Sequence, residues 1–192
     1  MKKWLLPVGI IALIVILIAS SYNGLVGLRA DAETAWANVE SSYQRRNDLI
    51  GNLVETVKGA AQHEQGTLTA VIEARSKATQ VNVDPSNITP EQLAEFQQAQ
   101  SGVSSALSRL LVSVERYPDL KANQNFLELQ SQLEGTENRI NVTRDRYNET
   151  VNVYDKKIKS FPQVLFSGIL GFKEMARFQA DEEARTAPKV QF

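Results

Sequence analysis

Apolar residues recur at helical spacing through residues 22–59. The steps alternate between three and four, and their mean is about 3.6 residues, the period of an α-helix. One helix over this range would be about 55 Å long. Arg46 is the one charged member of an otherwise apolar stripe. The stripe consists of Leu25, Leu28, Ala32, Trp36, Val39, Tyr43, Arg46, Ile50, Leu53 and Val57.

A second long stripe runs through residues 123–161, with a mean step of about 3.5 residues. It predicts a helix about 58 Å long, similar in length to the first. Because each helix must bury its stripe, we expect the two to pack antiparallel or nearly so. The second stripe consists of Phe126, Leu129, Leu133, Glu137, Ile140, Arg144, Tyr147, Val151, Tyr154, Ile158 and Phe161.

A third helix is predicted to begin at Thr89. Thr89 can cap the helix, Pro90 suits its first position, and Gln92 completes a capping box. The helix ends near residues 117–119. Its apolar face consists of Leu93, Phe96, Val103, Ala106, Leu107, Leu110 and Val114. The fold class is therefore all-α, an elongated antiparallel bundle of three long helices plus shorter ones over residues 22–162.

The segments between and after these helices are less regular. Gly59 and residues 63–66 mark a break, and residues 67–80 form either a separate helix or a bent continuation of the first. Residues 81–88 are rich in Asn, Asp, Pro and Ser and predict a loop. Residues 163–180 predict a short amphipathic helical segment, and residues 181–192 a flexible tail.

The N-terminal residues 1–21 predict a transmembrane anchor that contacts the lipid bilayer through residues 4–21. No charged residue occurs between Lys3 and Arg29, and Trp4 and Tyr22 stand about 27 Å apart along a helix, close to the hydrocarbon thickness. The alternative is a cleaved signal peptide. A retained anchor is favoured because helical periodicity begins almost directly after the possible cleavage site. The Lys2–Lys3 pair favours a cytoplasmic N-terminus, with the bundle outside the cytoplasm.

Composition narrows the possible chemistry. The chain has 192 residues, a formal net charge of −1, no cysteine and a single histidine. A thiolate or multi-histidine metal site within one chain is therefore excluded, and no basic field indicates nucleic acid as a partner. His63-Glu64 lacks the second histidine of a metalloprotease motif, since position 67 is Thr67. We predict no catalytic residue, no cofactor and no metal.

Charged and polar residues within or beside the long stripes predict a structural network. Buried charges need partners, and their best-attested benefit is a fixed register between helices. We expect a part-buried network between the first and last long helices. The alternative is that these side chains extend to the rim of the bundle. The candidates are Arg46, Asn52, Glu134, Glu137, Arg139 and Arg144.

Residues 163–178 have two interpretations as well. The segment either covers one end of the bundle, or it contacts a neighbouring subunit or a membrane. The candidate interaction residues are Phe166, Ile169, Leu170 and Phe172.

Several segments together resemble the LemA family. Those that carry the resemblance are residues 22–26 (YNGLV), 45–59 (RRNDLIGNLVETVKG), 63–64 (HE), 117–123 (YPDLKAN), 127–140 (LELQSQLEGTENRI), 146–148 (RYN), 161–162 (FP) and 171–172 (GF). The family usually has proline where this chain has Gly51, so the first helix lacks a forced kink. The resemblance implies an N-terminally anchored, extended helical bundle in a bacterial or archaeal envelope. It implies no reaction.

The function expected from these features is structural. We expect a non-enzymatic, membrane-anchored scaffold of the cell envelope that forms a homo-oligomer and shapes or organises membrane, since one member of the resembled family takes part in building magnetosome membranes. Gly9, the Ala12/Ala19 pair and the off-stripe residues Val26, Ala35, Leu49 and Val54 motivate the self-association. The alternative is a receptor-like or regulatory module that docks on a partner membrane protein.

Overall fold

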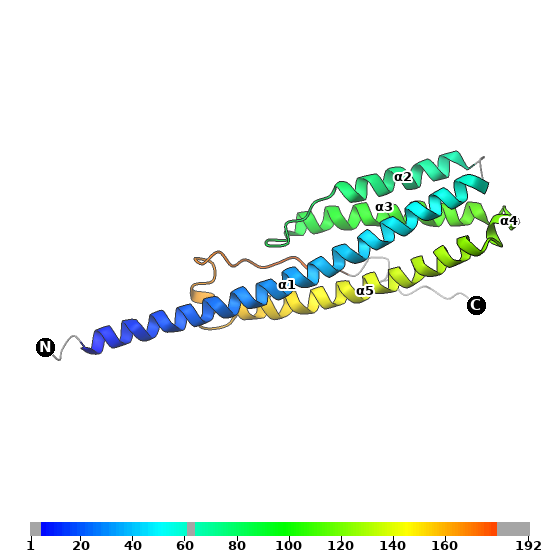
Figure 1. Cartoon of the computed structure of the whole chain (residues 1–192). Coiled ribbons are helices and arrows are strands. Elements are labelled where there is room, and N and C mark those ends of the chain that lie inside the picture. Colours follow the sequence, from blue (N-terminus) through cyan, green and yellow to red (C-terminus); the bar gives the residue numbers. More distant parts are fainter. Residues whose placement is uncertain (1–4, 61–63, 180–192) are drawn as a thin grey trace, which may run out of the picture.

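The first helix runs unbroken from the apolar N-terminal segment into the bundle. The computed structural model describes residues 5–60 and 64–179, and within them α1 spans Leu5–Ala60, 56 residues or about 84 Å. The boundary predicted after residue 21 therefore falls inside one continuous helix (Figure 1). Gly51 lies within α1 and does not interrupt it.

The N-terminal part of α1 projects beyond the other helices. Its large apolar side chains from Val8 to Ile18 are 36% to 64% exposed. In the described part of the chain, α1 is the one helix long and apolar enough to cross a membrane. From Leu25 onward the helix instead buries one side, and every member of the predicted stripe is buried except the half-buried Leu28.

The remaining elements pack around α1. They are α2 (Gln65–Gln80), α3 (Pro90–Val114), α4 (Pro118–Lys121), α5 (Gln124–Lys159) and the 3-10 helix η2 (Gln163–Leu165). Helices α2 and α5 run antiparallel to α1, whereas α3 runs in the same direction (Figure 1). The question left open for residues 67–80 is answered, because α2 is a separate helix that runs back along α1 (Figure 1). The all-α fold class is confirmed. His63 lies outside the described residues.

Side-chain caps mark where two of the helices begin. The Thr89 side chain accepts from the amide of Gln92, whose own side chain accepts from the amide of Thr89, so the predicted capping box is present. At the start of α5, the Asn123 side chain accepts from the amides of Asn125 and Phe126. These bonds satisfy backbone donors that have no partner within their own helix.

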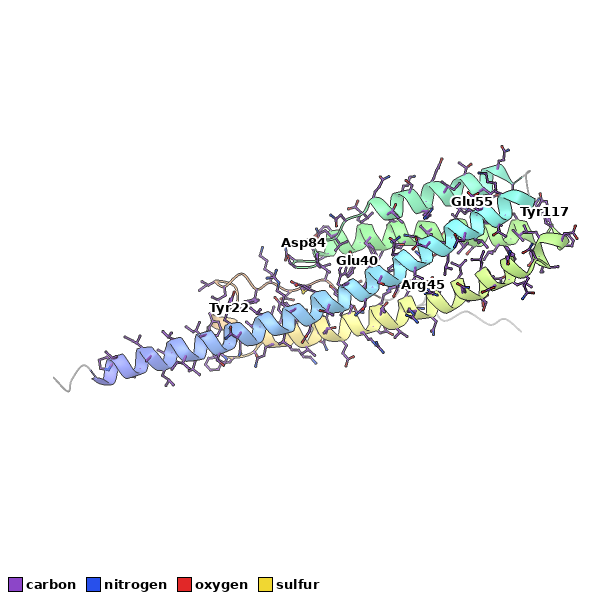
Figure 2. The ribbon with its side chains drawn as sticks, in the orientation of Figure 1. Tyr22, Glu40, Arg45, Glu55, Asp84 and Tyr117 are labelled. Carbon is purple, nitrogen blue, oxygen red and sulfur yellow. The ribbon has the colours of Figure 1, made fainter. Side chains whose placement is uncertain are left out.

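Two apolar clusters divide the core along the length of the bundle. We call the end of the bundle at Ser21 and Gln163 the proximal end, and the end at Tyr117 the distal end. Figure 2 shows Tyr22 and Tyr117 at these opposite ends. The proximal cluster is centred on Trp36, whose ring lies 5.3 Å from Phe96 and 5.4 Å from Tyr147. The distal cluster joins α1, α2, α3 and the first half of α5 around Ile50, Leu53 and Leu110.

Different segments cover α1 and α5 in the two halves. In the distal half, the α2–α3 hairpin packs beside them (Figure 1). In the proximal half, the α2–α3 loop and the start of α3 share the cover with the chain after η2, residues 166–179, which we call the strap. The strap runs back along the bundle and meets the α2–α3 loop, where the amide of Ala176 donates to the carbonyl of Ile88 at 2.9 Å.

The prediction of a helical segment over residues 163–180 was wrong in its secondary structure. Within residues 163–179, the described part of this segment, the helix is limited to Gln163–Leu165. The strap that follows consists of turns and irregular chain. Gly171 adopts a φ of 81°, which ends any helical continuation. After Gly171, the carbonyls of Lys173, Ala176 and Phe178 accept hydrogen bonds from α5 side chains. The predicted tail, residues 181–192, lies outside the described residues.

The second stripe also ends earlier than expected. Phe161 was expected on the buried face, but it lies after the last residue of α5 and is 80% exposed. Glu137, in the middle of α5, has a side chain that is 51% exposed.

Candidate functional site

A polar layer separates the two apolar clusters, and Arg46 is its centre. The Arg46 side chain is 3% exposed, although it carries a full charge in the middle of an apolar stripe. Burial of an unpaired charge would cost far more than the fold can supply, so its partners decide whether the layer is tolerated. Three helices, α1, α3 and α5, supply the layer.

The Arg46 side chain donates hydrogen bonds to two neutral side chains and to one carboxylate. One terminal nitrogen, Nη2, donates to the side-chain oxygen of Gln100 at 2.6 Å. The other, Nη1, donates to Ser104 Oγ at 3.1 Å and to Glu137 Oε2 at 3.2 Å. The guanidinium also lies 4.9 Å from the centre of the Tyr43 ring, a cation–π distance.

The burial of these partners is unequal, and this decides what each contributes. Gln100 is 5% exposed, whereas the Glu137 side chain is 51% exposed. The amide of Gln100 therefore depends on Arg46 for a partner, while the carboxylate of Glu137 remains hydrated. We infer that removing Arg46 strands a buried acceptor, whereas removing Glu137 leaves Arg46 two of its three side-chain partners.

The structure brings together two of the six predicted network residues, Arg46 and Glu137. Glu134 is exposed and accepts from Gln130 one turn earlier on α5. Arg144 is half-buried, and its guanidinium lies 4.6 Å from the centre of the Phe178 ring in the strap. The side chains of Asn52 and Arg139 are exposed.

Sequence reasoning missed Gln100 and Ser104, the contribution of α3 to the layer. A signal for Gln100 was present. It lies four residues after Phe96 and three before Val103, so it is a polar residue in line with the apolar face of that helix. A glutamine at such a position indicates a buried partner on a neighbouring helix.

A groove of about 280 Å³ lies over this layer, between α3 and α5. Its wall is mainly apolar, with Arg46 among its lining residues and two carboxylates, Glu134 and Glu137, beside it. Such a surface suits an apolar side chain or acyl group rather than a reacting polar substrate. The lining residues are Arg46, Val103, Ser104, Leu107, Ser108, Leu111, Gln130, Leu133, Glu134 and Glu137.

The strap is attached to α5 by a ladder of side-chain bonds. Tyr147 and Tyr154 donate their hydroxyl protons to the carbonyls of Ala176 and Lys173, at 2.8 Å and 2.9 Å. Asn148 bonds both ways, donating to the carbonyl of Phe178 and accepting from its amide. These bonds satisfy backbone groups that a helix would have satisfied internally.

The Asp155 carboxylate closes the same ladder from a buried position. Its Oδ1 accepts from the amide of Met175 at 3.3 Å, and Arg177 lies 4.0 Å from its other oxygen. Burial raises the pKa of the Asp155 carboxyl, and the Met175 amide and Arg177 offset part of that rise. Burial likewise raises the pKa of the Tyr147 hydroxyl.

The four predicted interaction residues divide between the core and the surface. Phe172 is buried, and its ring lies 5.5 Å from Tyr22 in an edge-to-face arrangement. Leu170 is half-buried against the proximal cluster, and Phe166 is half-buried. Ile169 is 87% exposed.

The LemA family model matches residues 35–192. The chain belongs to the LemA family. The match covers α2 to α5, the strap and α1 from residue 35 onward, so it begins after Leu25 and Ala32, the first core residues of α1.

The named relatives are distant. Magnetosome protein MamQ 1 of Paramagnetospirillum magneticum is 27% identical over 82% of this chain, and magnetosome protein MamQ of Magnetospirillum gryphiswaldense is 26% identical over the same share. This chain spans 64% of the length of each, a little under two thirds. Protein LemA of Metamycoplasma hominis is 26% identical, over 85% of this chain and 71% of its own length.

The first prediction concerns the polar layer of this LemA-family chain. Arg46→Ala is expected to lower the free energy of unfolding by about 3 kcal/mol, because it strands Gln100 and leaves a cavity. Glu137→Ala is expected to cost about 1 kcal/mol, because its carboxylate is half-exposed. Chemical unfolding in mild detergent, followed by circular dichroism, measures both values.

Arg45→Ala is the matched control, since Arg45 is adjacent in sequence and exposed (Figure 2). It is expected to change the free energy of unfolding by no more than about 0.5 kcal/mol. Equal losses for Arg46→Ala and Arg45→Ala would show that the layer is not structural.

The second prediction concerns Asp155 and pH. Its pKa is higher in the folded chain than the ordinary 3.8, so ionisation of the carboxyl opposes folding. This cost is absent below the unfolded pKa and complete above the folded pKa. Asp155→Asn retains an acceptor for the Met175 amide and is expected to be more stable than the natural chain at pH 7. The gain disappears below about pH 4.

Unfolding free energies at a series of pH values test this expectation. Asp145→Asn removes an exposed carboxylate from the same helix and is expected to show no such trend. An Asp155→Asn chain that is less stable at pH 7, with a deficit that closes in acid, would contradict the prediction.

Proposed function

We propose that this LemA-family protein is a rigid, membrane-anchored scaffold of the cell envelope, with no enzymatic activity. The observation that carries the proposal is the continuity of α1. The same helix presents an apolar surface on all sides up to Ala19 and a buried stripe from Leu25 to Val57. A helix without a joint between these parts transmits position and tilt from the membrane to the bundle.

The dimensions suit a spacer. The part of α1 after Ser21 extends for about 58 Å, so the distal end of the bundle would stand that far from the bilayer if α1 lay along the membrane normal. The Lys2–Lys3 pair favours a cytoplasmic N-terminus, with the bundle outside the cytoplasm of a bacterial or archaeal cell.

Self-association is the second part of the proposal, and the anchor supports it better than the bundle does. Leu49 and Val54 are buried within the protomer, so they are not available to a second copy. Gly9, Ala12 and Ala19 lie on the exposed part of α1, where small residues let two helices approach closely. A homo-oligomer joined through its anchors would organise the membrane around it. The magnetosome names of two relatives support that direction.

A docking module is the alternative function, and the groove over Arg46 favours it. An apolar groove of about 280 Å³ with one cation in its lining would accept an apolar side chain from a partner membrane protein. The scaffold is preferred because it accounts for the length of α1, whereas docking through this groove does not require it.

The third prediction is the mass of the full-length protein in mild detergent. Light scattering, with electron microscopy of the same sample, is expected to show a discrete assembly of several copies. Gly9→Leu is expected to reduce that assembly, because the larger side chain prevents close approach of the anchors. Gly135→Leu, at a site on α5 with open space around it, serves as the control. A monodisperse monomer of the unaltered chain would contradict self-association and favour docking.

A further inference from the structure

The turn that connects α5 to the strap exposes an apolar surface that the bundle does not cover. We call residues 160–170, which include the first five residues of the strap, the basal turn. Four of its large apolar side chains face solvent: Phe161 is 80% exposed, Val164 52%, Leu165 66% and Ile169 87%. Four large exposed apolar side chains within so short a turn are unusual for a surface that faces water.

Hydrogen bonds fix the shape of the turn, so its backbone holds these side chains away from the core. The amide of Val164 donates to the carbonyl of Ser160 at 2.9 Å, and that of Ser167 to Gln163 at 2.8 Å. Ser167 is buried, and its hydroxyl lies 3.3 Å from the carbonyl of Ile158. The backbone is therefore satisfied internally while the apolar side chains are held outward.

The basal turn lies where α1 leaves the bundle. The side-chain nitrogen of Gln163 lies 3.4 Å from the hydroxyl of Ser21, and Ser21 is the second residue after the apolar stretch that ends at Ala19. Figure 1 shows the turn in orange at the end of the bundle from which the bare part of α1 projects. A bilayer that holds residues 5–19 would have its surface at this level.

Basic side chains border the same end of the bundle. The last turn of α5 carries Lys156, Lys157 and Lys159, and Lys173 follows in the strap. All four are exposed, and Lys159 is paired with Glu174. Exposed apolar side chains beside lysines are typical of a surface that binds a membrane–water interface with anionic lipid headgroups.

We propose that the basal turn inserts its apolar side chains into the interfacial layer of the bilayer that holds α1. The proposal rests on the membrane anchoring in the proposed function and adds a second attachment point. A single helix can rotate and tilt in a bilayer, whereas two attachments on one rigid body fix its rotation. The bilayer is favoured over a second copy as the occupant because the turn is continuous with the anchor and bordered by lysines.

Single-cysteine labelling tests the insertion, because the natural chain has no cysteine. Leu165→Cys and Ile169→Cys carry an environment-sensitive dye in full-length protein, reconstituted at one chain per nanodisc that contains anionic lipid. Spin-labelled lipids with the radical near the headgroup quench dyes that enter the interface. Val112→Cys on α3, where the side chain is 71% exposed, is the matched control. Ile14→Cys, probed in parallel discs whose lipids carry the radical in the acyl chain, reports on the anchor.

Quenching at positions 165 and 169 is expected to exceed that at position 112 by at least about twofold, with emission shifted to shorter wavelength. Equal quenching at 165, 169 and 112, with position 14 quenched, would overturn the insertion and leave the anchor intact. Protection of 165 and 169 that appears only in discs with several chains would also overturn it, since a second copy would then be the occupant. An unquenched dye at position 14 would instead contradict the membrane anchoring itself.

Discussion

The rest of the structure depends on the continuity of α1. A helix that is apolar on all sides at one end and on one side at the other must have two surroundings, and α1 changes between them within about two turns after Ala19. Its stripe requires partners over the whole length of the bundle. The α2–α3 hairpin is too short to supply them near the proximal end, so α5 and the strap complete the cover there.

The Arg46 layer fixes how these partners align. An apolar stripe alone tolerates a shift of one helix along another, because apolar contacts are not directional. A buried guanidinium that bonds to α3 and α5 at once tolerates much less, since a shift of one turn would separate it from Gln100, Ser104 and Glu137 together. The layer thereby separates the distal cluster from the proximal one. The Trp36, Tyr147 and Phe178 rings pack on the proximal side of this layer.

Periodicity alone predicted the long helices and the buried stripe, because burial in a helical bundle follows directly from residue spacing. It did not select the partners of Arg46. Glu134, Glu137 and Asn138 lie within about one turn of α5, and the rotation of the packed helix decides which of them faces α1.

The strap was predicted as a helix because its apolar residues have near-helical spacing. Gly171 and the polar side chains of Tyr147, Asn148 and Tyr154 instead favour an irregular course, and residue spacing does not reveal these contacts.

A single helix that serves as both anchor and core element is the central claim, and one distance tests it directly. Spin labels at Ile16→Cys and Ala37→Cys would report on the helix across the membrane boundary, since both positions are exposed. In full-length protein in nanodiscs, pulsed electron paramagnetic resonance is expected to give a narrow distribution centred near about 32 Å, the length of 21 helical residues. A broad distribution, or one centred well below that value, would mean that a joint separates anchor from bundle and would contradict the account.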